Sequence, residues 1–390
     1  MPFFSSSSSS SPAASLARLP GFLRQESASR KTELQQLFSQ LNRQERQRLE
    51  AAYSPDSPFS TLQAVRPPAL GLNRYSDIVP FKHSQVVVGP SNQVQHRAVL
   101  STSYINANRI TAPSSLRSSL PTDWQGYIAT QAPLPQTQGQ FWKMVYEQNV
   151  HVIVCLTAVS PDPDRRAQKA ERYWPLAGET DETDNDICVR NVDSVDSQGQ
   201  VAYRHFEIWN PHEKGTSTAA AAAGRRNVLL VHYQGWPDHG VPATTDDLRE
   251  ILYRIRTWKT EQSKGNQQEA SLIPKNFGPM VVHCSAGCGR TGTFCVIDTL
   301  LSVLEKTNYP YVAPSPSGGN YATIHAGGAQ TVNQAVPSQG QQNDDDVYGW
   351  QSDRDIIYET LSSFREERML MVQTAVQYSF CYTAVRDLCQ

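Results

Sequence analysis

The sequence lacks any hydrophobic run long enough to cross a membrane. Its longest apolar stretch, Val150–Val159, falls well short of the roughly eighteen residues that a spanning helix needs. It is rich in β-branched residues and so predicts a buried strand. The chain also lacks an excess of either charge, with a net charge of -2 over 390 residues, which disfavours nucleic acid as a partner. We therefore expect neither a membrane span nor nucleic-acid binding.

A disulfide framework is also missing. The seven cysteines are odd in number and irregularly spaced, and Cys284, Cys288 and Cys295 fall on one short loop and helix. This distribution is typical of a reducing compartment, where thiols stay free. It predicts a cytoplasmic location, with the nucleus as a second compartment.

Three segments lack the large apolar side chains that a core requires. Residues 1–30 are rich in serine and predict a disordered tail, although the composition of Met1–Arg24 overlaps with that of a mitochondrial transit peptide. The stretch 212–226 holds five successive alanines, and 311–346 is rich in Gly, Pro, Gln, Asn and Ser. Because neither can offset its ordering entropy, both are predicted to be flexible inserts. The remainder of 31–390 predicts one domain.

Strand-like and helical patterns alternate through that domain. The predicted strands are 85–88, 127–130, 150–157, 201–208 and 278–282, and the predicted helices are 31–52, 142–148, 291–306, 353–371 and 374–388. This alternation predicts an α/β (α+β) fold, a single domain in which helices flank a twisted, mixed β-sheet.

The most informative motif joins one of those strands to one of those helices. It reads Val-Val-His-Cys-Ser-Ala-Gly-Cys-Gly-Arg-Thr-Gly and places Cys284 six residues before Arg290. Backbone N–H groups that converge at a helix N-terminus bind anions and stabilise a thiolate. A guanidinium can hold two phosphate oxygens at once. The motif therefore predicts a nucleophilic cysteine in a phosphate-binding loop, whose remaining members are Ser285, Ala286, Gly287, Cys288 and Gly289.

A second loop offers a proton donor. Asp238 lies in Gly235–Pro242, a segment punctuated by glycine and proline, with Trp236 as an anchor. A carboxyl group on such a loop can protonate a leaving oxygen. The same residues also suit an ordinary Pro-Asp-x-Gly turn, and His239 is a second titratable candidate. The spacing of these residues alone does not decide whether Asp238 is a catalytic acid or part of an ordinary turn.

The chain resembles the phosphotyrosine-specific protein tyrosine phosphatases over about residues 73–385. Motifs of that family follow one another in order at 73–77, 104–108, 131–135, 173–175, 236–238, 284–290 and 373–377. The low-complexity segments resemble those of fungal members. The loop motif at 284–290 alone would also fit dual-specificity or lipid phosphatases. The resemblance therefore depends on the whole series of motifs in this order.

The resemblance implies the catalytic roles. Cys284 would attack phosphorus to form a cysteinyl-phosphate, and Arg290 would bind the phosphoryl oxygens. Asp238 would act as general acid and then as general base, while Thr291 would hydrogen-bond the departing thiolate. The hydrolytic water would be placed by two glutamines, Gln373 and Gln377.

The resemblance also implies substrate contacts. Tyr75 would stack on the substrate ring and set a depth that suits phosphotyrosine, and Asp77 would accept N–H groups of the peptide. Lys169 would approach the acid on its loop. Ser76 stands where several relatives carry a charged residue, which puts selectivity for acidic flanks in doubt.

The function implied is a monomeric enzyme that needs no cofactor or metal and acts on phosphotyrosyl proteins, among them a mitogen-activated protein kinase. Two alternatives stay open, a dual-specificity phosphatase and a catalytically silent phosphotyrosine-binding module. A further hypothesis concerns Cys288, four residues from the nucleophile, which would modulate recovery from oxidation.

Overall fold

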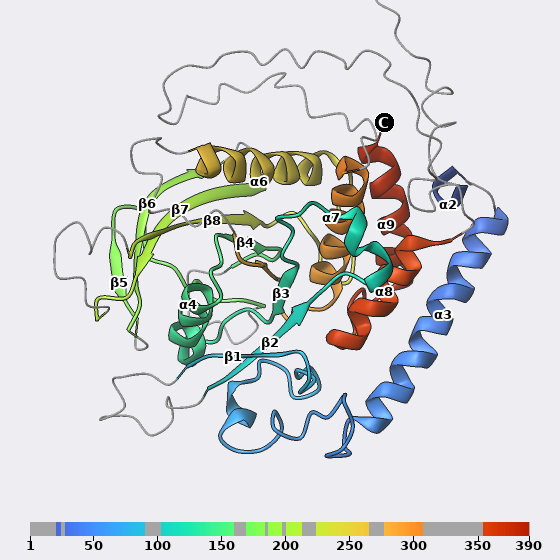
Figure 1. Ribbon diagram of the computed structural model, residues 1–390, viewed down its shortest axis with the longest axis horizontal. Helices are drawn as coiled ribbons and strands as arrows, with labels where there is room; N and C mark the ends of the chain where they lie inside the picture. Colours follow the sequence, from blue (N-terminus) through green and yellow to red (C-terminus); the bar gives the residue numbers. More distant parts are fainter. Residues whose placement is uncertain are drawn as a thin grey trace, which may run out of the picture.

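The computed structural model describes residues 21–24, 28–89, 103–159, 169–183, 186–196, 200–212, 224–264, 277–306 and 354–389. Within these ranges nine strands form one sheet in the order β1-β2-β3-β9-β4-β8-β7-β6-β5 (Figure 1). The strands are Gln85–Val87 (β1), Tyr104–Ile110 (β2), Tyr127–Thr130 (β3), Val152–Cys155 (β4), Thr180–Glu182 (β5), Cys188–Asp196 (β6), Val201–Trp209 (β7), Arg226–Tyr233 (β8) and Met280–His283 (β9). Strands β3, β9, β4 and β8 run parallel to one another, and all other pairs are antiparallel, so the sheet is mixed, as predicted.

Helices cover both faces of this sheet (Figure 1). They are Gly21–Arg24 (α2), Ala28–Ala51 (α3), Gln138–Glu147 (α4), Asp246–Lys264 (α6), Gly289–Lys306 (α7), Ile356–Glu367 (α8) and Ala375–Leu388 (α9). Short 3-10 turns occupy Ala69–Leu72, Ser114–Ser119 and Pro135–Thr137. The arrangement is one domain with two hydrophobic layers.

Alternation along the central strands separates those two layers. Val152 and Val154 of β4 pack with α6, α7 and α9, whereas Ile153 and Cys155 pack on the other face with α4. Successive side chains of a strand point to opposite faces. Since both faces are covered, the central strands are apolar throughout, as parallel strands usually are.

The predicted elements are confirmed in position, with boundaries that shift by a few residues. Strand 127–130 matches β3, and the helix predicted over 291–306 begins two residues earlier, at Gly289. Four strands and two helices were not predicted: β2, β5, β6, β8, α2 and α6. Strands β2 and β6 contain several polar residues, among them Asn106 and Asn191, which obscure the apolar runs on which the prediction relied.

The N-terminal tail is shorter than predicted. Residues 21–24 and 28–30 are helical instead of disordered, and Leu23 is buried. Arg30 donates to the carbonyl of Phe22 and to the carboxylate of Asp355 at 3.0 Å. A partner more than 300 residues away in the chain cannot be found from local composition. Residues 1–20 lie outside the described ranges.

Two other boundaries are corrected. The helix predicted over 353–371 ends at Glu367, and Leu370 and Val372 in the following loop have φ angles of 57° and 59°. The insert predicted over 212–226 ends earlier, since Arg226 is the first residue of β8. Residues 213–223, and the whole insert predicted at 311–346, lie outside the described ranges.

Candidate active site

The loop that holds Cys284, here called the phosphate loop (residues 284–290), connects β9 to α7 as predicted. Gly287 has a φ of 73°, and a Cβ atom there would lie 2.0 Å from the carbonyl oxygen of Thr130. Only glycine tolerates both the left-handed backbone and this close approach. The turn folds the loop back against β3, and it places Cys284 at the carboxyl end of a central strand.

The environment of Cys284 favours its thiolate. Burial of the side chain opposes ionisation, but the charge of Arg290 and hydrogen bonds from Thr291 and the Cys288 backbone outweigh it, so the pKa of Cys284 lies below that of a free thiol. Among the described residues, the buried hydroxyl of Thr291 has no other hydrogen-bond partner. The site therefore contains a cysteine that ionises more readily than an ordinary thiol.

His283, directly before the nucleophile, orients the strand end. Its ring nitrogens lie 2.7 Å from the Tyr173 hydroxyl and 3.0 Å from the carbonyl oxygen of Cys284. Complete burial lowers the pKa of His283 to about 4, so the ring is neutral at physiological pH. The side chain fixes the backbone at the loop, and no direct chemical role is indicated.

Arg368, which no sequence motif pointed to, supports the phosphate loop through its backbone carbonyls. This fully buried guanidinium donates to the carbonyls of Ala286 and Gly287 at 2.9 and 2.8 Å. It also donates to the side-chain oxygens of Asn106 and Asn108 on β2. With these carbonyls held by Arg368, the loop can present N–H groups on its other side, where an anion would bind. Arg368 was not singled out in the sequence because the helix predicted over 353–371 includes this position.

The acid loop (residues 235–242) lies against the phosphate loop. Asp238 Oδ1 accepts from Arg290 at 3.0 Å, and its Oδ2 lies 2.9 Å from Lys169 Nζ. The second guanidinium nitrogen of Arg290 donates to the Trp236 carbonyl at 3.2 Å. The buried Trp236 indole donates across the loop to the Gly240 carbonyl. The structure thus brings Cys284, Arg290, Asp238 and Lys169 together.

These contacts fix the charge of the acid in the free site. Partial burial would raise the pKa of Asp238, but Lys169, Arg290 and the more distant His239 lower it overall. His239 itself is exposed, with Nε2 3.9 Å from Asp238 Oδ2. Asp238 is therefore ionised at neutral pH while no phosphate occupies the site.

The two glutamines lie beside Gly289 of the phosphate loop. A Cβ atom on Gly289 would lie 2.6 Å from Gln373 Oε1 and 2.9 Å from Gln377 Oε1. Gln377 Oε1 accepts from the Gln373 backbone at 3.0 Å, and Gln377 Nε2 donates to the Gly240 carbonyl at 3.3 Å. Gln377 is completely buried and Gln373 is half-buried. Gln373 is thus the more accessible of the two, as the predicted water-placing role requires.

Tyr75 forms the wall of the site. Its hydroxyl lies 2.7 Å from Ser285 Oγ of the phosphate loop, and Asp77 is exposed two residues further on. Arg74 holds this segment in place: its guanidinium donates to the carbonyls of Ala132 and Pro133. A half-buried aromatic ring at this position suits an aromatic ester.

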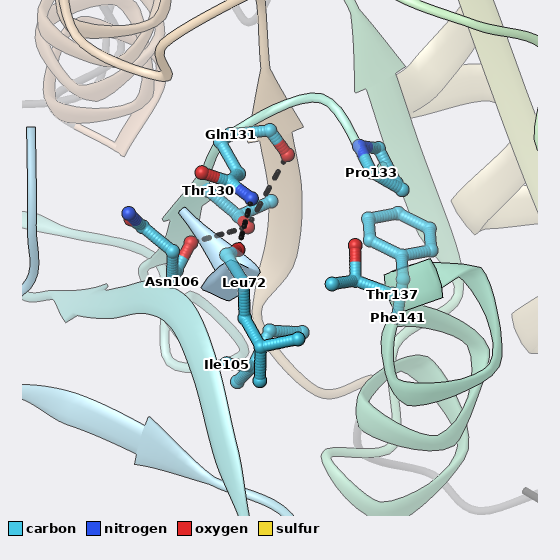
Figure 2. A pocket seen from close by; sticks show the side chains of 8 residues that line it. All are labelled: Leu72, Ile105, Asn106, Thr130, Gln131, Pro133, Thr137 and Phe141. Carbon is cyan, nitrogen blue, oxygen red and sulfur yellow. Dashed lines mark hydrogen bonds between the residues drawn. The ribbon is translucent and has the colours of Figure 1, made fainter. Parts of the chain in front are cut away.

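Gln131 ties the Tyr75 segment to the end of β3. Its Oε1 accepts from the Arg74 backbone at 2.8 Å. Its Nε2 donates to the Leu72 carbonyl at 2.9 Å (Figure 2). The small cavity beside it measures about 10 Å³, roughly the space of one water molecule. This cavity is too small for a ligand, so it reflects packing and not a second binding site.

Cys288 differs sharply from the nucleophile. Its side chain is completely buried, burial raises its pKa to about 12, and its Sγ lies 3.7 Å from the Ala286 carbonyl oxygen. A thiol with this pKa is protonated at neutral pH and reacts slowly. The structure favours a packing role for Cys288 over the predicted redox role.

None of the described helices is long and apolar enough to cross a membrane.

Comparisons with known proteins agree with the geometry of the site. Rat receptor-type tyrosine-protein phosphatase F is 34% identical over 253 residues, which cover 64% of this chain and 11% of the rat protein. The protein-tyrosine-phosphatase PTP1 of Arabidopsis thaliana is 29% identical over 315 residues, which cover 81% of this chain and 69% of the plant protein. This chain thus spans only a small part of the receptor-type relatives.

The fold comparison points the same way. The crystal structure of the catalytic domain of human protein tyrosine phosphatase non-receptor type 18 matches with a TM-score of 0.60 and 24% identity, over 92% of this chain and 97% of that domain. A family model described as protein-tyrosine phosphatase matches residues 70–315. That match covers more than half of the chain and includes Cys284, Arg290 and Asp238. The chain therefore belongs to the protein-tyrosine phosphatase family.

Proposed function

We propose that this protein hydrolyses phosphotyrosine in proteins through a cysteinyl-phosphate. The observation that carries the proposal is the convergence of Cys284, Arg290 and Asp238 in one site, with the pKa of Cys284 lowered by the charge of Arg290 and by loop hydrogen bonds. Phosphoryl transfer needs positioning and charge stabilisation more than covalent help from the protein. The phosphate loop supplies both.

In the first step the Cys284 thiolate attacks phosphorus. The S–P bond forms as the bond from phosphorus to the phenolic oxygen breaks, and protonated Asp238 gives its proton to that oxygen. A bound phosphate dianion takes over the contact of Arg290 with Asp238 (3.0 Å in the free site). Its charge also raises the pKa of the carboxyl group, because a nearby anion disfavours a second one. Substrate binding thus favours the protonated acid that this step requires.

In the second step water hydrolyses the cysteinyl-phosphate. Gln373 and Gln377, which lie over Gly289, position the water, and Asp238 now accepts its proton. The O–P bond forms as the S–P bond breaks. Thr291 and the loop N–H groups stabilise the departing thiolate, as they do in the free site.

Tyr75 supports a preference for phosphotyrosine over shorter phosphoamino acids. Its ring stands beside the phosphate loop, joined to Ser285 at 2.7 Å, and a long aromatic side chain can stack on it while its phosphate reaches Cys284. Solved relatives include human non-receptor type 18 in complex with HER2-pY1196 and HER2-pY1248 phosphopeptides. By analogy, we infer that phosphotyrosyl peptides bind here with Asp77 near the peptide backbone.

Two assays test the proposal. We expect the protein to hydrolyse p-nitrophenyl phosphate and Cys284→Ser to lose at least about 10³-fold in kcat/KM. Cys389→Ser, which changes a buried cysteine distant from the loop in sequence, should keep its activity. Full activity in Cys284→Ser would overturn the mechanism. Peptide binding without phosphate release would favour the silent binding module.

Comparison of phosphotyrosyl with phosphothreonyl peptides separates the proposal from a dual-specificity phosphatase. Equal kcat/KM for the two would favour the latter. A substrate-trapping Asp238→Ala variant, incubated with native cell lysate, then identifies the protein substrate. A mitogen-activated protein kinase is the first candidate, and cytoplasmic and nuclear fractions should be tested separately.

A further inference from the structure

The loop that presents Gln373 has an unusual backbone. In this segment (residues 368–374, the glutamine loop), Leu370 and Val372 have φ angles of 57° and 59°. Left-handed backbone is unfavourable for a non-glycine residue and persists only where the surroundings impose it. Gln373 directly follows Val372, so whatever holds these residues also fixes the direction of the glutamine.

Helix α3 supplies one of the groups that hold this loop. Glu45 is 2% exposed, and its Oε1 accepts the backbone N–H of Leu370 at 3.1 Å. The other carboxylate oxygen lies 3.3 Å from Arg48 Nη2, one turn along the same helix. A buried carboxylate that is oriented by an arginine is a rigid acceptor.

A second group of contacts runs through Arg365 of α8. Its guanidinium donates to the carbonyls of Met371 and Val372 at 2.8 and 2.6 Å. Asn42 of α3 orients it by accepting from Nη1 at 2.9 Å. The ring of Phe38, also on α3, lies 5.2 Å from the guanidinium carbon. Three successive residues of the loop, 370 to 372, are therefore held directly or indirectly by α3.

We propose that Glu45 and Asn42 of α3 are positioning residues for the hydrolysis of the cysteinyl-phosphate, because they hold the backbone from which Gln373 reaches the water. Figure 1 shows α3 running along α8 and α9, outside the sheet. The family model begins at residue 70 and does not include this helix. The inference rests on the proposed function and adds α3 to its second step.

This role has a kinetic signature. If only the second step slows, the cysteinyl-phosphate accumulates and kcat falls. KM falls by the same factor, because the accumulated intermediate ties up enzyme at low substrate. The ratio kcat/KM reports the steps up to release of the phenol and stays unchanged. General damage to the fold lowers kcat/KM instead.

The experiment uses the full chain with p-nitrophenyl phosphate, in the steady state and by stopped flow. In Glu45→Ala we expect intermediate decay to slow about tenfold, the order of effect that small misplacements of catalytic groups produce. A burst near one equivalent of p-nitrophenol per enzyme should appear, with kcat/KM within twofold of the unaltered protein. Asn42→Ala should show the same pattern more weakly. Glu45→Gln keeps an acceptor for the Leu370 N–H and should restore most of the decay rate.

Leu34→Ala is the matched control, because it removes a buried apolar side chain of α3, eight residues before Asn42, that cannot hydrogen-bond to the glutamine loop. It should lower the melting temperature and leave the burst unchanged. If Glu45→Ala fails to fold, the rates of intermediate decay in Asn42→Ala and Glu45→Gln test the inference. Unchanged decay in the folded variants, a fall in kcat/KM that matches the fall in kcat, or a burst in Leu34→Ala would overturn the inference. Absence of turnover in the unaltered protein would instead overturn the proposed function.

Discussion

Asp238 has to be protonated when it acts as an acid, yet its two cationic neighbours in the free site favour the ionised form. Lys169 and Arg290 lie 2.9 and 3.0 Å from its two oxygens. Arg290 is nearly buried, whereas the side chain of Lys169 is 53% exposed. Arg290 must also bind the phosphate, so Lys169 is the residue through which the pKa of the acid can be changed without loss of the phosphate site.

Lys169→Met should therefore shift the pH profile. Loss of the lysine removes the first of the influences that lower the pKa of Asp238, so this pKa rises. The basic limb of kcat/KM, which reports the acid in the free enzyme, should move to higher pH. Lys169→Arg, which keeps the charge, should leave the limb in place. A basic limb that does not move in Lys169→Met would mean that a group other than Asp238 sets it.

The candidate site residues could be named from the sequence, because they lie in short motifs. Cys284, Arg290 and Asp238 meet as predicted, and Lys169 contacts the acid. Arg368 could not be named, since its partners lie 81 and more residues away in the chain. A buried arginine is recognisable only when its acceptors are known.

At the scale of an element, the turn of the phosphate loop depends on Gly287. In Gly287→Ala the new Cβ would meet the Thr130 carbonyl at 2.0 Å, in a backbone region that alanine disfavours. We expect activity to be lost and the free energy of unfolding to fall by more than about 1–2 kcal/mol. Catalytic assays and chemical denaturation measure the two effects.

Gly178 provides the control for this prediction. Its φ is 83°, and nothing lies within 4 Å of a Cβ built there. Gly178→Ala therefore has the backbone strain without the collision. It should cost about 1 kcal/mol and leave kcat/KM unchanged. Equal losses in the two variants would mean that backbone strain alone, and not the approach to β3, makes glycine necessary at 287.

Elements with continuous apolar patterns were predicted well, and elements defined by distant partners were not. Helix α7 and strand β3 each contain a mainly apolar run and nearly match their predicted bounds. Helix α8 ends four residues before its predicted end, where Leu370 and Val372 adopt left-handed backbone. That conformation is imposed by Glu45 and Arg365, so no local pattern signals it.

For the whole molecule, two buried histidines predict a loss of stability in acid. Burial lowers the pKa of His151 and of His283 to about 4 from 6.5. Between these values the unfolded chain binds protons that the folded protein does not. The contribution of each histidine to the free energy of unfolding is therefore fully present above pH 6.5. It decreases as the pH falls toward 4, by up to about 3 kcal/mol for each histidine.

Urea denaturation as a function of pH tests this expectation. His151→Gln, at a site away from the phosphate loop, should remove about half of the histidine contribution. Burial raises the pKa of Glu45 and Glu367, which acts in the opposite direction, so the difference between the variant and the unaltered protein isolates the histidine. Parallel pH profiles for the two proteins would contradict the assignment.

The class of fold and the phosphate loop with its cysteine follow from the sequence alone, since apolar periodicity and the spacing of Cys284 and Arg290 are local properties. The folded chain, in contrast, sets how the site is supported. It placed Arg368 under the loop, Gln131 behind Tyr75, and α3 against the glutamine loop. Each of these contacts joins segments far apart in the chain. The physical reason is that a buried polar group must find a partner wherever the fold places one, and spacing along the chain does not record that place.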